Sequence, residues 1–128
     1  MKYSEITMLL KAAIAGKENQ TALGKIGYSK KAISFLKVLQ AEKLLTISKA
    51  KSVIKINPSK DLLEIKTFQI PVIYKVSDRE KIFRRFLSSD YEALVVSNQE
   101  GISLHVDSSE KIGGMILGKV YSLKRLTR

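Results

Sequence analysis

The chain has 128 residues, of which 45% are hydrophobic, so it can form one globular domain or two small lobes but not a large multidomain enzyme. Its 23 lysines and arginines outnumber 12 acidic residues, and a net charge of +11 on such an apolar chain indicates a folded protein that binds a polyanion. The absence of cysteine and the single histidine exclude disulfides, cysteine nucleophiles, thiolate metal sites and histidine-rich metal sites. No cofactor is expected.

The excess positive charge is concentrated towards the two ends of the chain. Residues 1–60 contain twelve lysines and three glutamates, residues 61–100 are nearly neutral, and residues 101–128 carry five basic and two acidic side chains. Nucleic acid is the favoured partner, while an anionic membrane, an acidic protein or lysines retained for solubility are alternatives. Neither a membrane-spanning stretch of about 20 apolar residues nor a targeting segment is expected.

The first part of the chain predicts two helices, a short strand and a hairpin. Ser4 can cap a helix over residues 4–16, residues 21–26 alternate as a short strand does, and Ser29 can cap an amphipathic helix that reaches Leu44. The alternating runs 52–57 and 62–68 flank a compact turn and predict a β-hairpin. Pro71 indicates an edge strand or a linker, which divides the chain into residues 1–69 and 70–128.

The second part predicts strands that alternate with short helices. Asp78 can cap a helix through Ser88, and residues 93–96 form a strand of the buried type. A polar loop over residues 97–101 then precedes a short strand at 102–104 and a helical turn at 107–112. Gly113 and Gly114 separate this turn from a last strand over residues 115–123 and a basic tail.

An enzymatic function is not expected. General acid–base catalysis needs titratable groups held together, yet His105 is alone and Asp78 with Glu80 is explained by helix capping. Gly113 and Gly114 lack the spacing of a dinucleotide or phosphate loop, so they indicate a tight turn or a place where the backbone of a ligand comes close.

Two groups of residues could bind nucleic acid. Ser97, Asn98 and Gln99 follow a buried strand, which would hold groups that donate and accept hydrogen bonds with bases and ribose, and Gly101 would admit a backbone. An ordinary polar turn is the alternative. In the other group, Ser29, Lys30 and Lys31 at a helix start could bind phosphate, or they could be a plain cap with solvated lysines. Tyr28 and Tyr74 could stack on bases or pack in the core.

Several segments, in this order along the chain, resemble the bacterial type of small-subunit ribosomal protein eight. The similar segments are Met8-Leu9 with Lys11, Gly27-Tyr28-Ser29-Lys30, the strand from Ala93 to Ser97 followed by Gly101, His105, and Ile112-Gly113-Gly114. In the late loop, Asn98, Gln99 and Glu100 replace the usual Thr, Ser and Lys, so the loop keeps hydrogen-bonding capacity but loses a positive charge.

The resemblance implies an α+β fold with two small lobes, the first α-β-α-β-β and the second mainly β with short helices. It also implies a structural protein of the small ribosomal subunit that binds the central domain of its rRNA by shape, supports assembly and contacts neighbouring ribosomal proteins. No membrane or small-molecule substrate is implied, and the protein would be a monomer within the ribosome. The RNA-binding residues would be Lys11, Ser29, Lys30, Lys31, Tyr74, Ser97, Asn98, Gln99, Gly101, Gly113 and Gly114.

Two departures from the family pattern, in the loop at residues 98–100 and in the shortened middle segment at residues 44–74, favour a mitochondrial ribosome. A bacterial cytoplasm or a plastid is the alternative location. A second hypothesis is a DNA-binding regulator in which residues 29–43 are a recognition helix and residues 52–68 a wing. A third, a phosphodiester-cleaving enzyme, would need a carboxylate cluster that the sequence does not provide.

Overall fold

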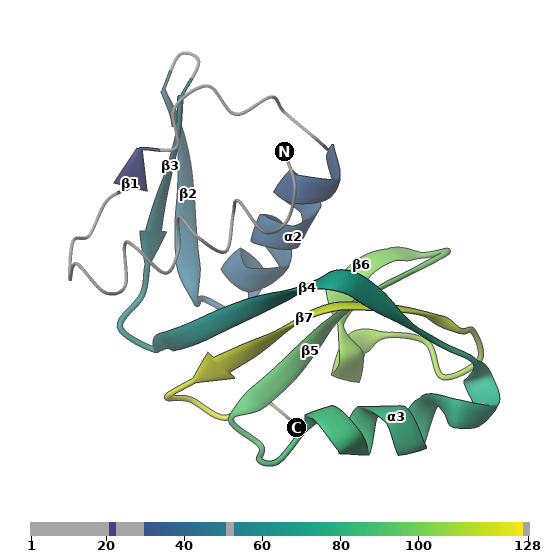
Figure 1. The fold of residues 1–128 in the computed structure, drawn as a ribbon. Coiled ribbons are helices and arrows are strands. Elements are labelled where there is room, and N and C mark those ends of the chain that lie inside the picture. The colour runs from purple at the N-terminus through teal and green to yellow at the C-terminus, as the bar shows by residue number, and fades with distance from the viewer. Residues whose placement is uncertain (1–20, 23–29, 51–52, 127–128) are drawn as a thin grey trace.

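The structure is a computed structural model that describes residues 21–22, 30–50 and 53–126. It confirms an α+β fold with two antiparallel sheets (Figure 1). The first sheet has the strand order β1-β3-β2, formed by β1 (Thr21–Ala22), β3 (Val53–Pro58) and β2 (Leu45–Ala50). The helix predicted for residues 4–16 lies outside the described residues.

Helix α2 (Lys30–Ala41) ends earlier than the predicted Leu44 because the backbone turns left-handed. Lys43 has a φ of 60°, and the Leu44 N–H donates to the Leu39 carbonyl at 3.0 Å, which closes the helix end. The buried face of α2 contains Leu36 and Leu39, as the helical spacing predicts, and also Phe35.

The second sheet has the order β4-β7-β5-β6, so β4 and β6 are its edges. Its strands are β4 (Leu62–Tyr74), β7 (Gly114–Ser122), β5 (Glu92–Asn98) and β6 (Gly101–Leu104). Between β4 and β5 lie the 3-10 helix η1 (Val76–Asp78) and the helix α3 (Arg79–Phe86), and η2 (His105–Asp107) follows β6. Figure 1 shows α2 and α3 on opposite sides of this sheet.

The predicted hairpin of residues 52–57 and 62–68 is wrong. Strand β3 pairs with β2, from Ala50 opposite Val53 to Leu45 opposite Pro58, whereas β4 pairs with β7 in the other sheet. The turn between β3 and β4 is closed by Ser59, whose carbonyl accepts from the Leu62 N–H and whose hydroxyl accepts from the Asp61 N–H, both at 3.2 Å. The Ser59 N–H itself continues the pairing with β2, because it donates to the Leu44 carbonyl at 2.8 Å. This turn therefore redirects the chain from one sheet to the other.

Two helix predictions also need correction. Asp78 precedes α3, but its side chain makes no capping hydrogen bond because its backbone already belongs to the 3-10 turn of η1. Residues 107–112 do not form a helix. Within this range only Asp107 is helical, as the last residue of η2, and the backbone of Ser108 after it is extended.

One hydrophobic core crosses the two sheets. Phe35 of α2 and Ile56 of β3 belong to the same buried cluster as Ala93 and Val95 of β5. Pro71, where the division between lobes is predicted, lies within β4, close to an irregularity in the pairing with β7. Its place on an edge strand suits a residue that cannot donate a backbone hydrogen bond.

Strand β5 is buried on both of its faces. Ala93 and Val95 face the cluster under α2, while Leu94 and Val96 face a second cluster that includes Phe83 of α3. All four side chains are completely buried. Because alternate residues of a strand point to opposite faces, α2 and α3 together fix β5 in position.

A buried ion pair holds the start of β5 to the neighbouring strand. The Glu92 carboxylate lies 2.8 Å from the Lys119 ammonium and also accepts hydrogen bonds from the Ser88 hydroxyl and the Ser88 and Ser89 N–H groups. Burial acts to raise the pKa of Glu92, but Lys119 and Ser88 outweigh it and lower the pKa to about 2. Burial likewise acts to lower the pKa of Lys119, but Glu92 outweighs it, so this pKa is raised.

Among the described residues, no helix is long and apolar enough to cross a membrane.

The Glu92 pair predicts a pH dependence of stability. The pKa of Glu92 is lower in the folded state, so its contribution is fully present above about pH 4.5 and is lost as the pH falls towards 2. A shift from 4.5 to about 2 corresponds to about 3 kcal/mol. Glu92→Gln should therefore lower the free energy of unfolding at pH 7 by about 3 kcal/mol, measured by urea denaturation, and flatten its dependence between pH 2 and 5. An unchanged pH dependence in this variant would contradict the assignment.

Candidate nucleic-acid interface

Strands β5 and β6 meet in a tight turn at one end of the second sheet. Asn98 pairs with Gly101, which leaves Gln99 and Glu100 at the exposed tip. The Asn98 Oδ1 accepts a hydrogen bond from the Glu100 N–H at 2.8 Å, and Gly101 has a φ of +117°, which glycine adopts readily. One amide oxygen of the predicted binding loop is thus used to shape the turn, while the Gln99 side chain is exposed.

Gly113 and Gly114 lie beside this turn because β7 begins between β4 and β5. A Cβ on Gly114 would lie 2.4 Å from the Ser97 carbonyl oxygen and 3.0 Å from the Tyr74 hydroxyl. A Cβ on Gly113 would lie 2.6 Å from the Tyr74 carbonyl oxygen. The two glycines therefore allow the strands of this chain to approach one another closely.

Tyr74 cannot stack on a base, so this part of the prediction is wrong. Its side chain is 2% exposed and its ring packs edge-on against Phe83, with the ring centroids 5.0 Å apart. Burial raises the pKa of Tyr74, against smaller opposing effects of the Arg79 charge and the Ser108 hydroxyl. The Tyr74 hydroxyl is buried and has no hydrogen-bond partner among the described residues.

Two lysines that the sequence did not single out lie at this end of the sheet. Lys75 is exposed, and its Cα lies 3.3 Å from the Cβ position of Gly113. Lys111 lies two residues before Gly113 and is also exposed. Its backbone N–H donates to the Ser109 hydroxyl at 3.2 Å. The pairing of Tyr74 with Gly114 brings Lys75 here. We call Gln99, Gly101, Lys75, Lys111 and Gly113 the turn-end surface.

Most basic residues near the C-terminal end are engaged within the protein. Lys119 is paired with Glu92, Arg125 contacts Asp90 at 2.6 Å, and the Lys124 ammonium donates to the Glu42 carbonyl. The following residue, Leu126, is 1% exposed, so the tail is anchored as far as the described residues extend. The positive charge counted at this end of the sequence is therefore only partly available to a partner.

The remaining predicted binding residues belong to the N-terminal part. Lys30 and Lys31 begin α2, but their side chains are outside the described residues. Lys11, Tyr28 and Ser29 lie wholly outside them. The structure thus brings together Ser97, Asn98, Gln99, Gly101, Gly113 and Gly114, and it does not place the second group beside them.

His105 has a structural role at the end of β6. Its Nδ1 accepts a hydrogen bond from the Leu94 N–H at 3.1 Å, which extends the pairing of β5 beyond Leu104. Burial, and then the Arg79 charge, lower the pKa of His105, so the ring is neutral and Nε2 carries its proton. No cluster of three or more histidine, cysteine, aspartate or glutamate side chains suited to a metal ion occurs within residues 21–22, 30–50 and 53–126.

Gly114 is crowded by the neighbouring strand and Gly101 is not, so an added methyl group should affect them differently. Gly114→Ala should shift the NMR resonances of Tyr74 and Ser97 and lower the free energy of unfolding by about 1–3 kcal/mol, because its Cβ meets backbone on β5. The Cβ of Gly101→Ala would lie in open space, so this variant should lower the free energy of unfolding only by the cost of the positive φ, about 1 kcal/mol. It should shift only the resonances of residues in the turn. Equal shifts at Tyr74 in both variants would contradict this packing.

Comparison of the sequence with protein-family models and with curated proteins finds no match.

Proposed function

We propose that this chain is a non-enzymatic RNA-binding protein, a structural constituent of the small ribosomal subunit that binds the central domain of its rRNA. The observation that carries the proposal is the turn-end surface. There a buried strand presents a polar turn with exposed Gln99 and Gly101, and the exposed Lys75 and Lys111 lie close to Gly113 in space or in sequence. Amide groups that donate and accept suit base and ribose edges, and ammonium groups suit phosphates.

The charge supports RNA as the polyanion, with recognition that depends on shape. Glu100 at the tip of the turn repels phosphate, whereas Lys75 and Lys111 lie to its side. This separation favours a ligand whose phosphates pass the lysines while unpaired or splayed bases meet the turn, as at an irregular RNA junction. The N-terminal residues Lys11, Ser29, Lys30 and Lys31 would supply a second contact with the same RNA.

Assembly support, contacts with neighbouring ribosomal proteins and a mitochondrial location are parts of the same proposal, and they rest on the sequence resemblance. The DNA-binding alternative finds no comparable support. Its wing was expected from residues 52–68, which belong to two different sheets and do not pair with each other.

The turn-end surface predicts which lysines contact phosphate. Lys75→Ala and Lys111→Ala should each weaken binding to a junction-containing rRNA fragment and reduce the slope of log K against log salt by about 0.7–0.9, the value for one phosphate contact. Lys60→Ala is the matched control, since Lys60 is also exposed but lies in the turn before β4, near the opposite end of that strand. An equal loss of slope in all three variants would remove the turn-end surface from the interface.

The turn itself should provide discrimination. Gln99→Ala should reduce the preference for the junction over a regular RNA duplex about tenfold, because about 1–3 kcal/mol of hydrogen bonding to base edges is lost. Adding Asn98→Ala should reduce it further, since the Asn98 Oδ1 also shapes the turn. The measurement compares both RNAs with one duplex DNA at the same salt concentration. Undiminished discrimination would make the loop a turn only, and equal affinity of the unaltered protein for the junction and for DNA would contradict the ribosomal proposal.

A further inference from the structure

A pocket unrelated to the turn-end surface lies between α3 and the segment that follows β6. Its volume is about 370 Å³, within the range of sites that hold small organic molecules. Phe83 and Leu87 from the helix side and Val106 of η2 give it apolar walls. The remaining lining residues are charged or polar, so the pocket combines apolar and ionic recognition.

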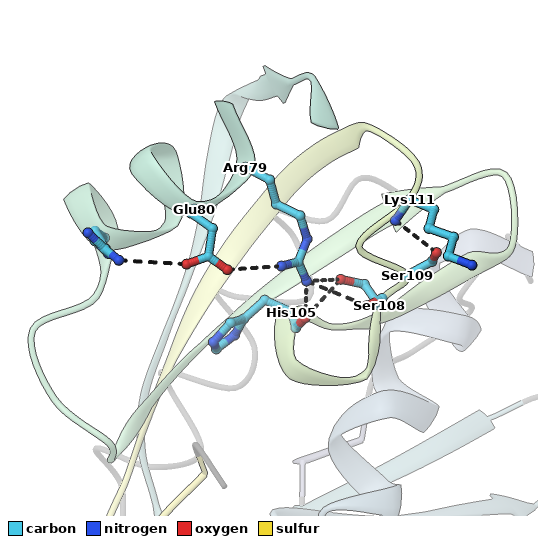
Figure 2. Close-up of polar contacts among 7 residues, drawn as sticks. Arg79, Glu80, His105, Ser108, Ser109 and Lys111 are labelled. Carbon is cyan, nitrogen blue, oxygen red and sulfur yellow. Dashed lines mark hydrogen bonds and ion pairs between the residues drawn. The ribbon is translucent and has the colours of Figure 1, made fainter. Parts of the chain in front are cut away.

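Arg79 is the buried cation of this pocket. Its side chain is only 9% exposed, although arginine seldom lies so deep. Figure 2 shows it reaching from α3 to the segment 105–108, where its Nη2 donates to the His105 carbonyl at 3.0 Å and to the Ser108 hydroxyl at 3.1 Å. Its Nε–H has no acceptor among the described residues, which is costly for a buried donor.

The counter-charge of Arg79 is weakly held. Glu80 lies 3.8 Å from Arg79 Nη1 and 3.9 Å from Arg84 Nη2, and both distances are longer than a hydrogen bond (Figure 2). The Glu80 side chain is 74% exposed, and surface ion pairs of this kind contribute little. An incoming carboxylate could therefore replace Glu80 between the two guanidinium groups.

The charge around the pocket distinguishes between anions. Glu80 and Glu110 offset Arg79 and Arg84, so a chain of phosphates gains little attraction here. A single carboxylate on an apolar group is different, because Arg79 Nη1 and the exposed guanidinium of Arg84 can each donate to it while the apolar walls cover the remainder. His105 also lines the pocket, and its Nε2 carries the ring proton because Nδ1 accepts from the Leu94 N–H.

We propose that this pocket binds a carboxylate attached to an apolar group, held by Arg79 and Arg84 after displacement of Glu80. Such a group occurs at the carboxyl terminus of a partner polypeptide and in small organic acids. The pocket uses none of the residues of the turn-end surface, although Glu110 of its lining is next to Lys111 in the sequence. If no carboxylate binds there, the proposed function is unaffected.

The test is an NMR titration of the full-length protein with N-acetyl-leucine, with N-acetyl-leucinamide as the uncharged control. At about 10 mM the free acid should saturate shifts of the Arg79 Nε–H and of the amides of residues 105–108, because millimolar affinity needs only about 4 kcal/mol. The amide should not produce these shifts. Benzoate provides the small-molecule arm: tighter binding of N-acetyl-leucine indicates a polypeptide terminus, and tighter binding of benzoate indicates a free acid.

Variants on the exposed side of α3 test the assigned roles without removing the buried arginine. Glu80→Gln should strengthen binding about 2- to 5-fold, the factor expected when a surface ion pair no longer competes. Arg84→Gln should weaken it by a similar factor, whereas Lys81→Gln, which removes the same charge from an exposed residue of α3 outside the pocket, should not. The proposal is overturned if no saturable shift occurs, if the amide acts as the acid does, or if Arg84→Gln and Lys81→Gln behave alike.

Discussion

Burial of β5 on both faces is the constraint on which the rest of the structure depends. Ala93 and Val95 require cover from α2 and the first sheet, and Leu94 and Val96 require cover from α3, so neither lobe can move away without exposing apolar surface. The Glu92–Lys119 pair fixes one end of the strand to β7. The polar turn at its other end is therefore carried on a rigid element, and its exposed groups are presented in a defined geometry.

The charge of the protein has two uses. One part is internal: Lys119 holds β7 to β5 within the second sheet, Arg79 holds α3 to the segment 105–108, and Lys124 binds the Glu42 carbonyl. The other part is exposed, as at Lys75 and Lys111. A net charge of +11 on its own does not separate these uses, because a buried and an exposed lysine count equally. Only the exposed part can produce salt-dependent binding of a polyanion.

Local patterns were enough to predict much of the fold, and the errors have physical causes. The apolar run of β5, the spacing of Leu36 and Leu39, and the place of Pro71 at a sheet edge follow from side-chain periodicity and backbone chemistry. Strand partners do not follow from local patterns, because β4 pairs with β7, whose residues lie 40 to 60 positions further along the chain. A compact turn beside two alternating runs also resembles a hairpin. Likewise, Ser97 and Asn98 of the predicted loop do meet Gly114, but Lys75 comes close to Gly113 only through the pairing of β4 with β7. Tyr74 and Arg79 could not be recognised as buried, since tertiary packing and not spacing decides their exposure.

The most direct test of the central claim is sedimentation of the tagged protein from the cells that make it. If the protein is a constituent of the small ribosomal subunit, it should move with that subunit through a sucrose gradient at moderate salt. It should be released together with other primary RNA-binding proteins only when the salt is raised, because phosphate contacts weaken with ionic strength. A protein that stays at the top of the gradient at low salt, or that sediments with DNA, would contradict the account.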